Sequence, residues 1–131
     1  MKIYLDIDGV ILTKEGKQMP FLKEFLLYVF NLAGDEVYWL STHCKDGNTD
    51  RVIKHLEGKV EDDVLEVLKI VKGTKWEDLK TEGIDLNSEF LWFDNNIFES
   101  EYRVLEKLNK DYCLIKVEGN LEELMEEDVN K

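Results

Sequence analysis

The stretch IYLDIDGVIL, residues 3–12, places a short apolar run directly before two aspartates near the start of a 131-residue chain. Continuous apolar runs rich in β-branched and aromatic residues are typical of strands buried on both faces of a parallel sheet. Three later runs share this character: VYWL at 37–40, FLWF at 90–93 and, more weakly, YCLI at 112–115. We therefore predict four buried strands.

Helical patterns alternate with these runs. Residues 20–33 repeat apolar side chains on one broad face, with Pro20 expected in the first turn and Gly34 at the stop. A second helix is predicted to begin after Asn48 or Thr49 and to run through residue 56, before Gly58. The alternation of strands and helices predicts an α/β domain with a mostly parallel sheet.

Three further segments complete this prediction. Residues 98–108 read as a helix, and residues 60–71 favour a helix with the alternative of a short strand at its end. The acidic tail carries Leu121, Leu124, Met125 and Val129 at the spacing of one helical stripe, which predicts a docked helix. With no repeat or linker, we expect residues 1–131 to form a single domain.

Composition narrows the function classes. The chain has 29 acidic against 17 basic residues, a formal charge of −12, which disfavours broad contact with nucleic acid or anionic lipid. No apolar run approaches a membrane span, and the first residues do not resemble a signal peptide. Cys44 and Cys113 are expected to be reduced thiols. We therefore expect a soluble protein of the cytoplasm that does not contact a membrane.

Polar side chains follow three of the predicted strands. Asp6 and Asp8 follow the first, Ser41 and Thr42 the second, and Asp94 the third. Ligands of open parallel sheets bind beyond the carboxyl ends of the strands, so these groups should meet at one edge. Such hard oxygen donors suit Mg²⁺, which shares its remaining positions with water and a substrate phosphate.

Each piece alone has a simpler explanation. The Asp-x-Asp-Gly sequence could form a turn, although it fails as a calcium loop because Ile11 replaces the required glycine and Lys17 the final glutamate. A Ser-Thr pair often caps a helix, and Asp-Asn-Asn often forms a turn. Their joint occurrence after buried strands is what favours a site.

The sequence also resembles a known family. IYLDIDGVIL resembles the first motif of the haloacid dehalogenase (HAD) superfamily of phosphohydrolases, VYWLST its second and FLWFDNN its fourth. The resemblance covers the whole chain, and it is close to small members without a cap domain. It implies a Rossmann-like, three-layer α/β/α fold around a mostly parallel sheet.

The resemblance also implies roles for the strand-end residues. Asp6 would be the nucleophile that forms an aspartyl-phosphate, and Asp8 would be the general acid and base. Mg²⁺ would be held by the Asp6 carboxylate, the Asp8 backbone carbonyl and the Asp94 carboxylate. Ser41, or alternatively Thr42, would donate a hydrogen bond to the phosphate. Because residues two apart in a strand point to the same side, we expect the first two carboxylates to flank one phosphate.

The family further uses a lysine between the second and fourth motifs. Lys72, Lys75 and Lys80 lie in range, and Lys80 is favoured because it opens the helix-start pattern KTEG, 14 positions before Asp94. Lys75 is the main alternative; it is less favoured because the adjoining Trp76 is expected to anchor that stretch to the core.

Several neighbouring residues are given simpler roles. Asn95 stands where many relatives carry a second acid; it could still coordinate a metal or bond to a metal-bound water. Glu99 and Glu101 are expected to lie on a solvated helix face. His43 is expected to pack in a loop, with a substrate role as the alternative, and Cys44 is not expected to act as a nucleophile.

The spacing of the motifs leaves no room for a cap. A short flap turning near residues 15–16 and two helices between residues 42 and 80 fill the usual insertion points. The resemblance thus implies a Mg²⁺-dependent phosphohydrolase with an uncovered site and a phosphorylated substrate of unknown identity. The alternatives are an inactive module that binds phosphate or metal and, disfavoured by motif order, a phosphoacceptor receiver domain.

Overall fold

The computed structural model describes residues 1–129, and side chains as far as residue 126. Four parallel strands form the sheet in the order β2-β1-β3-β4. They are β1 (Lys2–Leu5), β2 (Val37–Trp39), β3 (Phe90–Asp94) and β4 (Leu114–Lys116). Strands β1 and β3 are the two central strands, each with a neighbouring strand on both sides, which fits their mostly apolar sequences.

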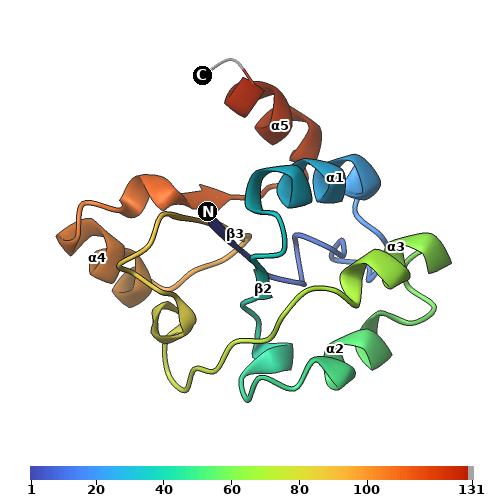
Figure 1. Ribbon diagram of the computed structural model, residues 1–131, viewed down its shortest axis with the longest axis horizontal. Coiled ribbons are helices and arrows are strands. Elements are labelled where there is room, and N and C mark those ends of the chain that lie inside the picture. Colours follow the sequence, from blue (N-terminus) through green and yellow to red (C-terminus); the bar gives the residue numbers. More distant parts are fainter. Residues whose placement is uncertain (130–131) are drawn as a thin grey trace.

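Within the described residues, five α-helices connect and cover the strands (Figure 1). They are α1 (Leu22–Ala33), α2 (Thr49–Leu56), α3 (Asp62–Leu68), α4 (Glu99–Lys107) and α5 (Leu121–Val129). Helices α1 and α5 lie side by side, whereas α4 lies apart from them across the sheet. The expected mixed α/β architecture with a parallel sheet is therefore present.

The core has two parts because alternate strand residues face opposite sides of the sheet. Ile3, Leu5 and Trp39 belong to the larger cluster, which includes buried residues of α1, α2, α3 and α5. Tyr4 and Trp92 belong to the smaller cluster, which includes Leu105 of α4 and the segment around residues 76–84. Helices on both faces leave the strand ends as the open edge of the sheet.

Most predicted elements occur where expected, with two corrections. The predicted fourth strand at 112–115 begins later, because Asp111–Cys113 forms a 3-10 turn and the strand occupies Leu114–Lys116. Pro20 lies before α1 rather than in its first turn, since Phe21 adopts a left-handed conformation (φ 67°) and the helix begins at Leu22. The side chain of Val129 lies outside the described residues.

Other expectations are confirmed. Asn48 caps α2, its side chain accepting a hydrogen bond from the Asp50 backbone N–H at 3.0 Å. Residues 60–71 contain helix α3, and Lys72 beyond it makes a single parallel bridge to Tyr38. Within the described residues, no helix is long and apolar enough to cross a membrane.

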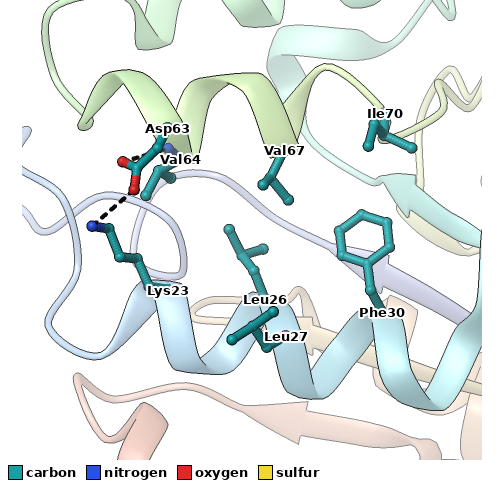
Figure 2. A pocket seen from close by; sticks show the side chains of 8 residues that line it. All are labelled: Lys23, Leu26, Leu27, Phe30, Asp63, Val64, Val67 and Ile70. Atoms are coloured by element: carbon teal, nitrogen blue, oxygen red, sulfur yellow. Dashed lines mark hydrogen bonds and ion pairs between the residues drawn. The ribbon is translucent and has the colours of Figure 1, made fainter.

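An apolar hollow of about 340 Å³ lies between α1 and the α3 segment (Figure 2). Leu26, Leu27 and Phe30 line one side of it, and Val67 and Ile70 line the other. Its lining includes no residue of the strand ends, so the hollow is a feature of the helical layer and not of the polar edge.

Candidate functional site

The ends of β1 and β3 bring Asp6 and Asp94 together. The parallel register pairs Leu5 with Phe93, so the two aspartates lie one residue further along adjacent strands. The Asp6 backbone N–H donates to the Phe93 carbonyl at 3.0 Å, which continues the ladder to this point. Both side chains are buried, with relative exposures of 9% for Asp6 and 1% for Asp94.

Lys80 supplies the positive charge between these carboxylates. Its Nζ lies 2.8 Å from Asp94 Oδ2 and 3.4 Å from Asp6 Oδ1. The lysine is itself buried, and it begins the 3-10 turn Lys80–Gly83 in the predicted KTEG segment. Lys75 instead lines a separate hollow with Lys45 and Trp76, so Lys80 is the lysine that the structure places beside Asp6.

Burial and the nearby Asp94 carboxylate raise the pKa of Asp6 to about 7, against the opposing effect of Lys80. Burial alone would lower the pKa of Lys80, but Asp6 and Asp94 more than offset that effect and hold it above its usual value. The cluster therefore retains a charged lysine while one of its carboxyl groups takes up a proton readily.

A buried glutamate holds the lysine segment in place. Glu101 Oε2 accepts a hydrogen bond from the Lys80 backbone N–H at 2.6 Å, and Oε1 accepts one from the Phe98 N–H at 2.8 Å. Glu101 is only 2% exposed, so the expectation of a solvated glutamate is wrong. Of its two partners, Lys80 lies 21 residues away, beyond the reach of a helical pattern; Glu99, in contrast, is exposed as expected.

Asp94 is fixed by contacts on both oxygens. Oδ2 accepts from Trp92 Nε1 at 3.1 Å as well as from Lys80, and Oδ1 accepts from the Asn96 backbone N–H at 3.0 Å. A carboxylate with this many donors is held in one orientation. The rigid member of the pair is therefore Asp94, whereas Asp6 has the weaker contact with the lysine.

Asp8 lies in a different environment. Its carboxylate is 65% exposed and lies 3.0 Å from Nε2 of His43, with His55 Nε2 at 3.9 Å from the other oxygen. The regular strand ends at Leu5, so the rule that residues two apart share a side does not extend to Asp8. Asp6 therefore belongs to the cluster with Lys80 and Asp94, whereas Asp8 belongs to a second cluster with the two histidines.

Sequence reasoning missed this second cluster. His43 was expected to pack in a loop, yet its ring stacks on that of His55, with the ring centroids 4.1 Å apart, and both rings lie beside Asp8. Burial, with the neighbouring His43 and Lys59, lowers the pKa of His55. The available signal was composition: both histidines of the chain occur within 13 positions, on either side of the cap of α2.

The second strand delivers Ser41 to the same edge. Ser41 is 1% exposed, and its Oγ accepts a hydrogen bond from the His43 backbone N–H at 3.1 Å. This contact uses an acceptor position and leaves the hydroxyl proton free to donate. Thr42 is less buried and begins the 3-10 turn, so Ser41 is the better placed of the two candidates.

Asn95 has a structural contact that the sequence did not reveal. Its Nδ2 donates to the Val117 carbonyl at 2.8 Å, which ties the end of β3 to the chain after β4. Gly9, with φ 88°, lies so close to this side chain that a Cβ at position 9 would collide with it. Both residues border an open hollow of about 620 Å³, whose lining includes Lys14 and Lys116.

The two clusters offer different kinds of ligand atom. Asp6 and Asp94 offer hard carboxylate oxygens around one ammonium group, whereas Asp8 stands with two imidazoles. Comparison of the chain with protein-family models, with curated proteins and with solved structures found no match. Any assignment of function therefore depends on the chemistry of these side chains.

Proposed function

We propose that this chain is a Mg²⁺-dependent phosphohydrolase of the HAD type, with Asp6 as its nucleophile. The observation that carries the proposal is the buried arrangement of Asp6, Lys80 and Asp94 at the open edge of a parallel sheet. Burying two carboxylates and an ammonium is costly unless they are paired, and such groups cluster at functional sites.

The donor set fits Mg²⁺. The Asp6 and Asp94 carboxylates contact the same Lys80 nitrogen and so lie next to each other, as a shared hard cation requires. As the family resemblance implies, Asp8 would contribute its backbone carbonyl, which leaves its side chain for proton transfer. When bound, Mg²⁺ supplies positive charge that offsets the repulsion between the carboxylates and a phosphate.

Asp6 would attack the phosphorus of a phosphomonoester and displace the alcohol oxygen. The new bond joins a carboxylate oxygen to phosphorus and gives a mixed anhydride, as a carboxylate nucleophile permits. Lys80 would offset the negative charge of the carboxylate and of the transferring group. Ser41, whose hydroxyl proton is free, would donate to a phosphate oxygen and orient the group for in-line attack.

Asp8 would move the protons. Its carboxyl group would donate a proton to the leaving alcohol oxygen and, as a carboxylate, would then take a proton from the water that attacks the anhydride. The exposure of this side chain allows it to meet both the leaving group and water. Hydrolysis then returns Asp6 to its carboxylate and releases inorganic phosphate.

The test is hydrolysis of a generic phosphomonoester such as p-nitrophenyl phosphate, with Mg²⁺ and with chelator, followed by a panel of phosphorylated metabolites. We expect turnover that requires Mg²⁺ and that is lost in Asp6→Asn. Tight metal or phosphate binding without turnover would favour the inactive binding module. Stable phosphorylation without release of phosphate would favour a phosphoacceptor domain.

A further inference from the structure

Asp8 and the two histidines converge from three separate segments. Asp8 follows β1, His43 lies in the 3-10 turn Thr42–Cys44 after β2, and His55 lies in the last turn of α2. Helix α2 packs against that 3-10 turn, which brings the two rings together. The fold therefore presents one carboxylate and two imidazoles at the surface beside the buried cluster.

Their spacing is close to that of a metal's ligands. One ligand atom from each residue lies within 4.8 Å of the other two, and the two contacts to Asp8 measure 3.0 and 3.9 Å. A tetrahedral zinc with bonds of about 2.0–2.1 Å separates its ligand atoms by about 3.3–3.4 Å. Small side-chain adjustments would bring the three atoms to that spacing.

His55 provides an independent observation. Its Nε2 is buried yet has no hydrogen-bond partner, and the nearest carboxylate oxygen, on Asp8, is too far at 3.9 Å to serve as one. Buried polar atoms without partners are rare in native proteins, and an ion is one of the recognised explanations for them. The atom that lacks a partner is also the atom that faces Asp8.

We propose that the side chains of Asp8, His43 and His55 form a zinc site beside the proposed oxygen-lined magnesium site. Imidazole nitrogens with one carboxylate suit Zn²⁺, whereas Mg²⁺ prefers oxygen donors. The side chains of His43 and His55 are 30% and 28% exposed, and Asp8 is more exposed still. The fourth ligand of the zinc would therefore be water.

Lys59 holds the His55 ring in a protonation state that opposes zinc binding, so a change at position 59 provides a test. Its ammonium lies 3.3 Å from His55 Nδ1 and can only donate, so the neutral ring carries its proton on Nε2. Zinc on Nε2 requires the proton on Nδ1 instead, and Lys59 would then keep only its 2.8 Å bond to the His55 carbonyl. A glutamine at position 59 could accept from Nδ1–H, as partners of metal-bound histidines commonly do.

The zinc site goes beyond the proposed phosphohydrolase but shares Asp8 with it. Zinc on the Asp8 carboxylate would occupy the group assigned to proton transfer, so zinc is expected to inhibit turnover. Zinc binding itself is measured without substrate. If no turnover is found, the zinc measurement still tests the zinc site. If no zinc binds, the turnover assay still tests the phosphohydrolase.

The experiment is a Zn²⁺ titration of the tag-free full chain by competition with a chromophoric chelator, in the presence of excess Mg²⁺. We expect one zinc per chain, and His43→Ala or His55→Ala to weaken binding by at least about 100-fold, more than the loss of a supporting hydrogen bond costs. Lys59→Gln should tighten binding severalfold, while Lys54→Gln, an exposed charge change on the helix that carries His55, should not.

Co²⁺ gives a second readout on the unaltered protein. We expect the visible spectrum of a four-coordinate nitrogen and oxygen site, without the thiolate charge-transfer band that Cys44 or Cys113 would produce. The proposal is overturned if zinc affinity is unchanged in both histidine variants. It is also overturned if Lys59→Gln and Lys54→Gln behave alike, or if the cobalt spectrum shows thiolate or six oxygen ligands.

Discussion

Asp6 and Asp8 are two residues apart in sequence, yet they occupy opposite kinds of environment. Asp6 is buried with Asp94 around an ammonium, and its pKa is raised to about 7 by burial and by the Asp94 carboxylate. Asp8 is 65% exposed and faces two imidazoles. The difference arises because β1 ends at Leu5, so that the backbone after it no longer alternates regularly.

This contrast suggests that Asp6 and Asp8 have different chemical roles. A buried carboxylate with a fixed cation is suited to bond formation with an anionic group, because neighbouring charges are strong where water is excluded. An exposed carboxylate beside imidazoles is suited to exchange protons or to bind a softer cation. The predictions below test whether the two clusters are as separate as the structure indicates.

The largest effect is expected for Asp6→Asn. The amide cannot form the anhydride, so turnover of p-nitrophenyl phosphate with Mg²⁺ should fall by at least about 1,000-fold, a loss of about 4 kcal/mol in transition-state stabilisation. Circular dichroism should show an unchanged fold. Asp35→Asn, which changes an exposed carboxylate just before β2 and away from the carboxyl ends of the strands, is the matched control. Turnover within about tenfold of the parent would remove Asp6 from the mechanism.

Lys80→Met should affect both activity and stability. Two buried carboxylates would be left without their cation, and breaking a buried pair in this way costs about 3–5 kcal/mol. We expect a matching fall in the free energy of urea unfolding and a loss of turnover. Lys75→Met should leave both nearly unchanged; an equal effect in the two variants would contradict the placement of Lys80.

Asn95→Asp addresses the position where the sequence suggested a missing acid. The carboxylate would face the Val117 carbonyl in place of a donated hydrogen bond, so we expect a loss of about 1–3 kcal/mol in stability without metal. Asn96→Asp, which alters an exposed side chain next to it, is the control. Stability equal to that of the parent would mean that the contact with Val117 contributes little. Tighter Mg²⁺ binding by the variant would instead indicate that Asn95 stands in place of a carboxylate ligand.

The raised pKa of Asp6 predicts a smaller, pH-dependent effect. Between about pH 4, near the ordinary aspartate value, and about pH 7, the folded protein holds a proton on Asp6 that the unfolded chain has lost. The stability of the parent relative to Asp6→Asn should therefore decrease as pH rises through this window and level off above it. Urea unfolding of both proteins in chelator, from pH 4.5 to 8, measures the difference. A difference that is constant or rises with pH would contradict the burial of an ionisable Asp6.

Much of the site was predictable because it follows from strand ends. Apolar runs located the strands, and parallel pairing placed the groups at their carboxyl ends along one edge, where the pairing of β1 with β3 makes Asp6 and Asp94 neighbours. Lys80 was identified by its position in a helix-start pattern, and it does begin a 3-10 turn. These features depend on local sequence and on the position of residues at strand ends, and both can be recognised from apolar runs and turn residues.

Other features could not be predicted because they depend on contacts between distant segments. Glu101 carries no mark that separates it from the exposed Glu99 until helix α4 is placed against Lys80. The approach of His55 to Asp8 spans 47 positions and depends on how α2 packs against the turn after β2. Periodicity assigns a residue to a face of its helix, but it does not identify the neighbour on that face.

The most direct test of the central claim is to trap the covalent intermediate. The protein is mixed with a phosphomonoester and Mg²⁺, quenched during turnover and treated with borohydride, which reduces an aspartyl-phosphate to homoserine; peptide mass spectrometry then locates the change. The account predicts homoserine at position 6, absent in Asp6→Asn and reduced in Lys80→Met. Turnover with an unmodified Asp6, or modification at Asp8 or Asp94 instead, would contradict it.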